Sequence, residues 1–417
     1  MKIKIPYDRS FIDMDVQDDR VAGILHPNKV PARDQAEVLE AAMKRPCGGP
    51  SLDEFLKEAK NLLIIVNDGT RPTPTSKVLD FLKEKLEGMD FKFIVATGIH
   101  RAPTREEFEF IFGPACYEKW RERIHVHDSR ASQDMVFIGE SAAGTKMRVN
   151  RMGVDAGAIL VIGSVEPHYF GGYTGGRKSF LPGIASYETI EQNHKYAIRP
   201  EPASLKLKGN PVHEDMIDAI KTIETKPIFS IQTVLDRDRN IYAATAGDIH
   251  QSFDAAIEKS NDVFCVKIPE KCDVVVSAAP YPMDVDLYQS QKAIDNAKLA
   301  LKEGGVLILV SKCRMGIGEA SFFELMASSG TAKGILEKID REYKLGYHKA
   351  AKLAEIALWA QMWAFTGLSD EEVSSVLMKP VKDLQAAVDD ALKKRGEGAK
   401  VLFMMDGGVT VPLVEKQ

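Results

Sequence analysis

Residues 166–195, EPHYFGGYTGGRKSFLPGIASYETIEQNHK, gather two histidines, a glycine-rich turn and a lysine in one short segment. An imidazole can act as a general acid or base near neutral pH, and it can ligate a metal ion. A lysine amine can contact a phosphate or act as a nucleophile. The segment therefore predicts a site that uses His168, Lys178 and His194, although a lone histidine or lysine is more often structural.

The turn FGGYTGGRKS contains four glycines. Glycine lets a backbone approach a ligand closely, and successive backbone N–H groups can hold a phosphate. Gly172, Gly175 and Gly176 are the candidate contacts, and a flexible turn is the alternative. The spacing fits neither a Walker A loop nor GxGxxG. Arg177 is interpreted either as a contact for a larger anionic substrate or as a surface residue.

Three further motifs, NDGTRPTP, ATGIHRAPT and YPMDVDLYQSQK, place polar side chains after strand-like runs. His100 and His168 could flank one substrate, which suits removal and return of a proton without stereochemical preference. Arg71 could hold a carboxylate with two parallel hydrogen bonds, or simply belong to a turn. Gln289 and Lys292 lie on adjoining faces of a predicted helix, where a solvated face is the alternative.

Two further pairs of residues, one of histidines and one of tryptophans, are weaker indications of a site. His125 and His127 alternate as in a strand and could form a metal pair. Trp359 and Trp363 have i,i+4 spacing, which predicts a helix facing the core; a tryptophan lid, with Trp359 as the lid residue, is the alternative.

The elements that must position these residues follow from the spacing of apolar residues. Short apolar runs separated by helical patterns are typical of parallel α/β sheets, in which sites form at the carboxyl ends of strands. We expect strands at residues 61–67, 91–98, 157–164, 272–280, 306–313 and 400–408, and helices at residues 75–88, 104–113, 285–305 and 331–362. The helix at 104–113 opens with a capping-box pattern.

The length of 417 residues favours two domains. We expect an N-terminal α/β domain at residues 1–268, carrying the glycine loop and the acid/base histidines. A Rossmann-like α/β domain at residues 269–417 would contribute substrate-binding residues. The predicted fold class is two α/β domains with largely parallel sheets and an active-site cleft between them.

Composition narrows the class of partners. A net charge of −5 argues against nucleic acid as the main partner. The five scattered cysteines favour reduced thiols and a cytoplasmic location. The N-terminus lacks a signal-peptide pattern, and no apolar run reaches the roughly 20 residues that a membrane span needs.

Taken together, the segment at 166–195 and the motifs DGTRPTP, GIHRAPT and YPMDVDLYQSQK resemble the nickel-dependent lactate racemase family, in order and over most of the chain. Agreement of several motifs at once is more specific than any one of them. The resemblance implies a nickel pincer nucleotide (pyridinium-3-thioamide-5-thiocarboxylic acid mononucleotide) with carbon-bound nickel. It also implies inversion at C2 of a 2-hydroxy acid by proton-coupled hydride transfer.

The resemblance assigns roles to matching positions. Lys178 matches the lysine that tethers the cofactor, His194 the nickel ligand, and His100 and His168 the acid/base pair. The other matched positions are Arg71, Gln289 and Lys292 for the substrate, and Asp68, Thr70, Gly172, Gly175, Gly176 and Tyr288 for the cofactor. Implied partners are a small 2-hydroxy acid and the proteins that build the cofactor, with a monomer or homodimer as the assembly.

Two alternatives stay open from the sequence. One is a hydrolase or lyase that uses a plain divalent metal at His168 and His194. The other is a non-catalytic protein that binds the nickel nucleotide, against which the pair of histidines argues. Lactate, malate, aromatic or longer aliphatic hydroxy acids and sugar acids are all candidate substrates.

Overall fold

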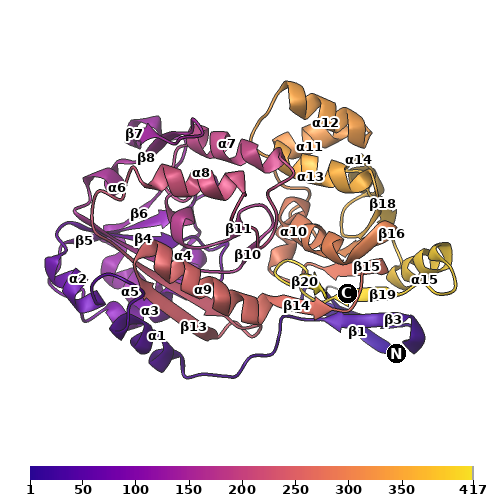
Figure 1. Cartoon of the computed structure of the whole chain (residues 1–417), viewed down its shortest axis with the longest axis horizontal. Coiled ribbons are helices and arrows are strands. Elements are labelled where there is room, and N and C mark those ends of the chain that lie inside the picture. Colours follow the sequence, from indigo (N-terminus) through magenta and orange to yellow (C-terminus); the bar gives the residue numbers. More distant parts are fainter. Residues whose placement is uncertain (416–417) are drawn as a thin grey trace. The chain divides into compact units, whose positions relative to one another are not determined.

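The computed structural model describes residues 1–415, which form two compact units (Figure 1). The middle unit is residues 29–263, and the terminal unit combines residues 1–28 with the chain from residue 264 onward. Each unit holds a largely parallel sheet with helices, as the predicted fold class requires. The prediction of a domain from residue 1 to residue 268 differs at its start. Residues 1–28 join the terminal unit because β3 (Val21–Leu25) pairs with β19 (Val401–Met404).

The sheet of the middle unit has the order β13-β12-β9-β4-β5-β6, parallel except for the β12–β13 pair. Its strands are β4 (Leu62–Asn67), β5 (Phe91–Ala96), β6 (Ile124–Val126), β9 (Ala158–Ser164), β12 (Ile228–Leu235) and β13 (Ile241–Gly247). All residues of β9 are buried, which explains why this strand is an unbroken apolar run rather than an alternating one.

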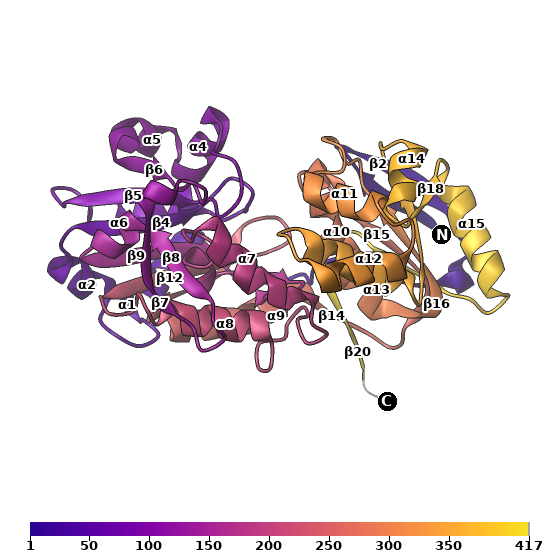
Figure 2. The same cartoon turned by 90° about the horizontal axis from the view of Figure 1, so that it is seen from above.

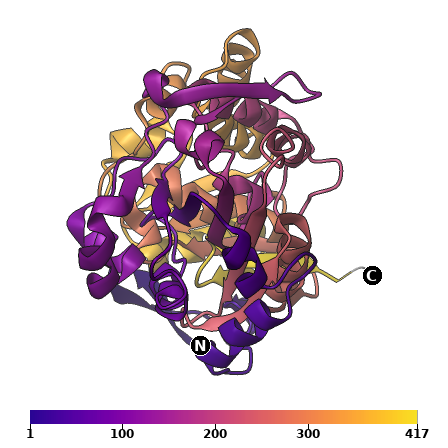
Figure 3. The same cartoon turned by 90° about the vertical axis from the view of Figure 1, so that its left-hand side faces the viewer.

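Helices cover both faces of this sheet, as Figure 3 shows from a second side. They are α1 (Gln35–Lys44), α2 (Leu52–Glu58), α3 (Thr75–Leu82), α4 (Arg105–Phe112), α5 (Pro114–Trp120), α6 (Arg151–Asp155), α7 (Tyr187–Lys195), α8 (Pro211–Ile220) and α9 (Ile249–Phe264). Helices α1 to α5 bury their apolar residues in one core against β4, β5, β9 and β12. The other face receives a short 3₁₀ helix, η4 (Gly176–Ser179), which contacts β4, β9 and α8.

The terminal unit has a fully parallel sheet with the order β18-β17-β16-β15-β19-β3. Its further strands are β15 (Cys272–Ala278), β16 (Leu301–Val310), β17 (Gln361–Phe365) and β18 (Lys379–Val381). The hairpin of β1 (Lys2–Tyr7) and β2 (Ser10–Asp15) and helix α15 (Leu384–Arg395) share a core with one face of the sheet. A short parallel pair is formed by β14 (Cys265–Ile268) and β20 (Val411–Val414).

The remaining helices of the terminal unit are α10 (Leu287–Ala297), α11 (Ala320–Ala327), α12 (Ala332–Arg341), α13 (Tyr347–Ala357) and α14 (Asp370–Ser375). Helices α11 and α12 both pack on α13 (Figure 2). Within residues 1–415, no helix combines the length and the apolar character that crossing a membrane requires.

Most predicted elements are present, with three corrections in the terminal unit. The helix expected at residues 331–362 is two helices, α12 and α13, separated by residues 342–346, and β17 already begins at Gln361. The helix expected at residues 285–305 is shorter, because β16 already begins at Leu301. The tryptophan pair does not share a helix: Trp363 is a buried residue of β17, and Trp359 lies in the turn after α13. The i,i+4 spacing was misleading because α13 ends at Ala357, before both tryptophans, and a strand follows. The capping box of α4, with Thr104 and Glu107, is confirmed.

A buried carboxylate ties three parts of the middle unit together. Asp215, on α8, is 3% exposed and accepts hydrogen bonds from Ser141, Thr145 and Asn193, the last two at 2.8 Å. Ser141 and Thr145 lie in the turn between β7 (Met135–Glu140) and β8 (Lys146–Asn150), whereas Asn193 belongs to α7. Asp215 therefore holds the C-terminal end of α7 in position, and this end of the helix carries His194.

We expect Asp215→Ala to destabilise the chain by about 3 kcal/mol or more, because three donors lose a buried acceptor. Asp218→Ala is the matched control: Asp218 lies one turn further along α8 and binds Ala142 of the same turn, but it is partly exposed. Its loss should cost only about 1 kcal/mol. Urea unfolding of both variants measures the difference, and equal losses would contradict the role given to Asp215.

Candidate functional site

Three loops of the middle unit follow adjacent strands of its sheet. Strands β5, β4 and β9 are neighbours, and the loops that carry His100, Asp68 and His168 begin where these strands end. The carboxyl ends of parallel strands lie at one edge of a sheet. The structure thus brings together the residues whose convergence the sequence predicted.

Asp68 and His100 form the first contact of the site. The Asp68 Oδ2 lies 2.7 Å from His100 Nδ1, while Oδ1 accepts from the Thr70 hydroxyl at 2.7 Å and from the Thr70 amide at 3.1 Å. Asp68 is 5% exposed, whereas the imidazole of His100 is partly exposed. A buried carboxylate thus orients a histidine whose ring reaches solvent.

The charge state of Asp68 settles which nitrogen of His100 carries a proton. Burial raises the pKa of Asp68, but the hydrogen bond and charge of His100, with Thr70 and Arg71, outweigh burial and lower the pKa overall. An ionised carboxylate can only accept, so Nδ1 of His100 donates. When His100 is neutral, its Nε2 therefore has a free lone pair, which is the state of a general base.

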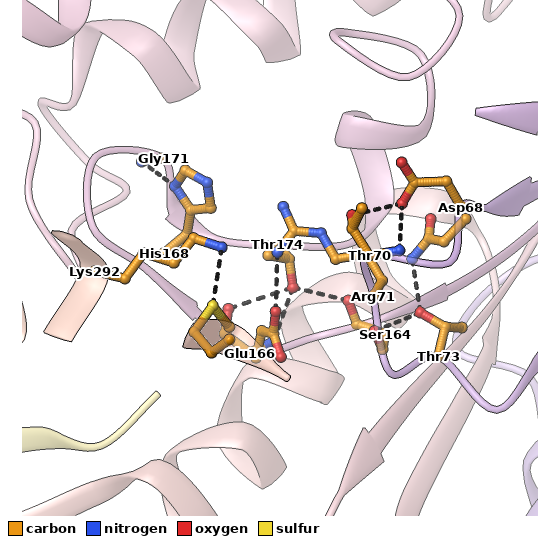
Figure 4. Close-up of polar contacts among 12 residues, drawn as sticks. Asp68, Thr70, Arg71, Thr73, Ser164, Glu166, His168, Gly171, Thr174 and Lys292 are labelled. Carbon is orange, nitrogen blue, oxygen red and sulfur yellow. Dashed lines mark hydrogen bonds and ion pairs between the residues drawn. The ribbon is translucent and has the colours of Figure 1, made fainter. Parts of the chain in front are cut away.

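A chain of polar contacts links the loop after β4 to the loop after β9 (Figure 4). Arg71 Nη1 donates to Glu166 Oε1 at 3.1 Å, and the Thr174 hydroxyl accepts from the Glu166 amide at 3.0 Å. Below them, the hydroxyls of Thr73 and Ser164 lie 2.8 Å apart. Arg71 is therefore held in one direction by Glu166.

The glycine turn begins with a small antiparallel hairpin of β10 (Pro167–His168) and β11 (Gly172–Tyr173). Within it, the Gly171 amide donates to His168 Nδ1 at 3.1 Å (Figure 4). Since Nδ1 accepts, the proton of the neutral ring resides on Nε2. His168 is thus in the opposite tautomer from His100.

The aromatic ring of Phe170 lies close to three residues that the sequence predicts for the site. Its ring centre lies 4.6 Å from that of His168 and 5.0 Å from that of His194, and Lys178 Nζ lies 5.6 Å away. Lys178 is partly exposed in a segment that is otherwise buried from residue 171 to residue 181. A Cβ built on Gly171 would make an ordinary contact with this amine, at 3.7 Å, and a tight one with His168 Nδ1, at 3.2 Å.

His194 is a buried, neutral histidine near the end of α7. Burial, and then the charge of Lys178, lower the pKa of His194 to about 3. Its Nδ1 lies 3.2 Å from Asn193 Oδ1, and the Asn193 amide nitrogen donates to Asp215 Oδ2 and to the Val212 carbonyl. Asn193 thus presents its oxygen to His194 Nδ1, which donates, and Nε2 has the lone pair that a metal would need.

The glycine turn forms hydrogen bonds and close contacts within the protein. The amides of Thr174 and Gly176 donate to the Glu166 carbonyl and to Gln232 Oε1, so with Gly171 three N–H groups are used inside the protein. A Cβ on Gly175, which has a φ of +85°, would lie 2.6 Å from Gln232 Oε1. These contacts give the phosphate-holding interpretation of the loop no support, and that role of Gly172, Gly175 and Gly176 stays a prediction.

Two interpretations of single residues are wrong. Arg177 is not a surface residue, because it is 1% exposed and donates to carbonyls of its own loop. His127 does not form a metal pair with His125: its Nε2 donates to the Ala185 carbonyl at 2.9 Å, and Asn150 approaches its Nδ1 at 3.4 Å. Within residues 1–415, no three acidic, histidine or cysteine side chains cluster as a metal site.

The residues predicted for the second domain lie in the terminal unit, at the start of α10. Asp286 caps this helix by accepting from the Gln289 amide at 2.6 Å. Lys349 Nζ lies 3.8 Å from the centre of the Tyr288 ring, and Lys292 Nζ lies 3.9 Å from the Met283 sulfur. Tyr288, Gln289 and Lys292 therefore share the first turns of one helix; their meeting with the residues of the middle unit stays a prediction.

Sequence reasoning missed four residues that shape the site, namely Glu166, Phe170, Asn193 and Gln232. Glu166 had a signal, since it is a charged residue directly after a strand. Gln232 also had one, because a polar residue in the middle of a buried strand needs a partner. Phe170 and Asn193 had none, as their roles depend on three-dimensional neighbours.

Known proteins resemble the whole chain. Sequence models of the lactate racemase N-terminal and C-terminal domains match residues 7–205 and 267–412. The lactate racemase of Thermoanaerobacterium thermosaccharolyticum is 32% identical over 429 residues, with 99% of each chain covered. That of Lactiplantibacillus plantarum is 31% identical over 428 residues, covering 98% of this chain and 99% of the relative.

Solved structures agree. The lactate racemase apoprotein of Thermoanaerobacterium thermosaccharolyticum has a TM-score of 0.91 at 31% identity, covering 99% of this chain and 100% of the other. A Thermotoga maritima protein shares the fold, with a TM-score of 0.69 at 19% identity over 92% and 98% of the two chains. The protein is an isomerase of the racemase class. The chain belongs to the lactate racemase family.

The buried His127 predicts a pH dependence of stability. Burial lowers its pKa from 6.5 to about 4. Between these values the unfolded chain binds a proton that the folded chain does not, so stability falls as the pH drops from about 6.5 to about 4, by about 3 kcal/mol in total.

We expect His127→Gln to flatten the curve of unfolding free energy against pH in this window. A glutamine amide can still donate a hydrogen bond, but it does not titrate. His125→Gln is the neighbouring control and should change the slope less, because His125 is exposed. Denaturant unfolding at several pH values measures both slopes. An unchanged slope in His127→Gln would show that His127 does not resist protonation.

Proposed function

We propose that this racemase inverts C2 of a 2-hydroxy acid, with lactate as one candidate substrate, and uses a nickel pincer nucleotide. The observation that carries the proposal is the pair of histidines in the middle unit with opposite Nδ1 partners. His100 donates from Nδ1 to the Asp68 carboxylate, and His168 accepts at Nδ1 from a backbone amide. At Nε2, one ring can thus take a proton and the other can donate a hydrogen bond, so the two rings offer different partners to a substrate oxygen.

The residues around Phe170 fit the cofactor. Its attachment needs an amine within reach, and Lys178 is the partly exposed residue of a buried turn. Its metal needs a neutral imidazole, and His194 stays neutral down to about pH 3. The nickel also needs only one protein ligand, since the nucleotide supplies the other donors. In this proposal Lys178 tethers the nucleotide, His194 Nε2 ligates nickel, and Asp68, Thr70 and Tyr288 line the site.

The chain's own residues handle the proton. When bound, the nickel nucleotide would supply the hydride chemistry at C2. His100 Nε2 takes the hydroxyl proton of the substrate, and the ionised Asp68 stabilises the imidazolium that forms. His168 Nε2–H would donate a hydrogen bond to the carbonyl oxygen of the planar 2-keto acid from the other side. Both groups are placed by short contacts within the middle unit, which lowers the entropy of reaching reactive geometry.

Arg71 supports the assignment of an acid as substrate. Glu166 occupies its Nη1, and the guanidinium has further N–H groups for a bidentate contact with a carboxylate. Arg71 is partly buried, and its pairing with Glu166 holds the guanidinium in one place, so its remaining N–H groups are positioned for a carboxylate. Lys292 and Gln289 are the partners proposed from the terminal unit.

The decisive experiment is intact-mass and peptide mass spectrometry with metal analysis, on chain produced in a host that makes the cofactor. We expect a mass increase on the Lys178 peptide, about one nickel per chain, and racemisation of lactate or another 2-hydroxy acid. Lys178→Ala should lose all three. Lys195→Ala, an exposed lysine of the same segment, should lose none.

An unmodified Lys178 without nickel, in a host shown to charge a known racemase, would overturn the cofactor proposal. Activity with an added divalent metal and no adduct would then favour a plain metal enzyme. An adduct without turnover of any 2-hydroxy acid would instead indicate a protein that only binds the nucleotide.

Asp68→Asn tests the tautomer of His100. An amide at this position can present its NH₂ group to Nδ1, which would move the ring proton to Nε2 and remove the base. We expect kcat to fall by about 10²- to 10⁴-fold. Asp53→Asn, at an exposed aspartate that pairs with Lys85, should leave kcat unchanged. Full activity in the loaded Asp68→Asn variant would exclude Asp68 as the partner of the base.

A further inference from the structure

Arg177 is a buried cation, which is an unusual place for an arginine side chain. Burial lowers the pKa of its guanidinium to about 9, and the charge of Asp254 offsets this only in part. Within residues 1–415, its hydrogen bonds are with backbone carbonyls and not with carboxylates. A buried charge without a close counter-ion is costly, and such groups are found where function needs them.

The guanidinium closes the glycine turn like a fork. Nη2 donates to the Gly171 carbonyl at 2.7 Å, and Nη1 donates to the Gly175 carbonyl at 3.3 Å. The ring of Phe253 lies 4.4 Å from the guanidinium carbon and holds it from one side. One planar group thus fixes both ends of residues 171–175 at once, which a single ammonium cannot do with the same geometry.

Gly171 connects this fork to His168. The residue that gives its carbonyl to Arg177 also gives its amide hydrogen to His168 Nδ1, at 3.1 Å. The Gly171 amide belongs to the peptide whose carbonyl, that of Phe170, accepts from Asn210 Nδ2 at 2.7 Å, while Arg177 holds the next peptide. The torsions of Gly171, which no side chain restrains, link the two peptides. If Arg177 releases the Gly171 carbonyl, Asn210 alone holds the neighbouring peptide, and the donation from the Gly171 amide to His168 Nδ1 weakens.

We infer that Arg177 is a positioning residue that acts through Gly171 to hold His168 in the tautomer with the proton on Nε2. This inference rests on the proposed function only for the acid/base role of His168. It replaces the interpretation of Arg177 as a substrate contact, because the side chain points at its own loop. The same fork holds the turn from which Lys178 follows.

The test is ¹⁵N NMR of histidine-labelled chain without cofactor, at about pH 8, above the ordinary histidine pKa of about 6.5. His168→Gln identifies the signals of His168. In the wild type we expect one protonated and one unprotonated ring nitrogen, with the proton on Nε2. In Arg177→Met we expect the two signals to move toward each other, because both tautomers become populated. Arg177→Lys should lie between the two, as one amine can replace only part of the fork.

Arg130→Met is the matched control. Arg130 lies in the same unit with its guanidinium carbon 3.9 Å from the centre of the Tyr187 ring, but it is exposed and outside the turn. Its loss should leave the His168 signals unchanged. A wild type with the proton on Nδ1 would overturn the inference. So would a folded Arg177→Met, or Arg177→Lys if the methionine variant does not fold, with the wild-type signals.

The NMR readout does not depend on racemisation. Should Lys178 prove unmodified, the proposed function fails while the tautomer result for His168 still decides the role of Arg177. Should the tautomer be independent of Arg177 in a chain that carries the Lys178 adduct and racemises its substrate, only the inference fails. In the loaded enzyme, a positioning role predicts that Arg177→Lys lowers kcat by about tenfold or more with KM changed less.

Discussion

The burial of residues 167–181 against β4 and β9 is the constraint on which the rest of the site depends. Packing this segment on a sheet leaves no space for side chains at several positions, so glycine stands there. Burial also removes water as a hydrogen-bond partner, and the backbone amides of the turn must therefore find acceptors within the protein. His168 Nδ1 and Gln232 are two of those acceptors. The chemistry of the site and the satisfaction of a buried backbone are thus met by the same contacts.

Burial acts on the two histidines beside Phe170 in different ways. His194 has a pKa of about 3 because burial and the nearby Lys178 both disfavour a charged ring. A ring that cannot be protonated in the physiological range is a poor acid but a constant metal ligand. His168 is buried to a similar extent, and the hydrogen bond from the Gly171 amide sets which of its ring nitrogens carries the proton. His100 is more exposed and has a carboxylate partner at Nδ1.

The sequence predicted much of this arrangement because its signals are local. Apolar runs marked β4, β5, β9 and β15, and polar residues after three of those strands indicated the edge at which the site lies. Capping at Thr104 followed from side chains three residues apart. The end of α13 at Ala357, before both tryptophans, could not be predicted, because i,i+4 spacing is the same whether or not the helix continues. Arg177 and Asn193 were beyond reach for another reason. Arg177 binds backbone carbonyls and Asn193 binds a carbonyl and a buried aspartate. Contacts of this kind form only in the folded chain and leave no pattern in the sequence.

The opposite tautomers of His100 and His168 have a consequence for a reaction that must run in both directions. In the proposed mechanism, a substrate whose hydroxyl faces His100 meets a base with a carboxylate behind it. The mirror-image substrate presents its hydroxyl to His168, which has its proton on Nε2 in the resting chain. For His168 to accept a proton there, its own must first move to Nδ1, and the bond from the Gly171 amide must break, since two donors cannot face each other. The two directions therefore start from different protonation states of the free enzyme. A hydrogen bond from a backbone amide, rather than a charged partner, keeps that exchange possible, because a neutral hydrogen bond is about half as strong as one to an ionised group.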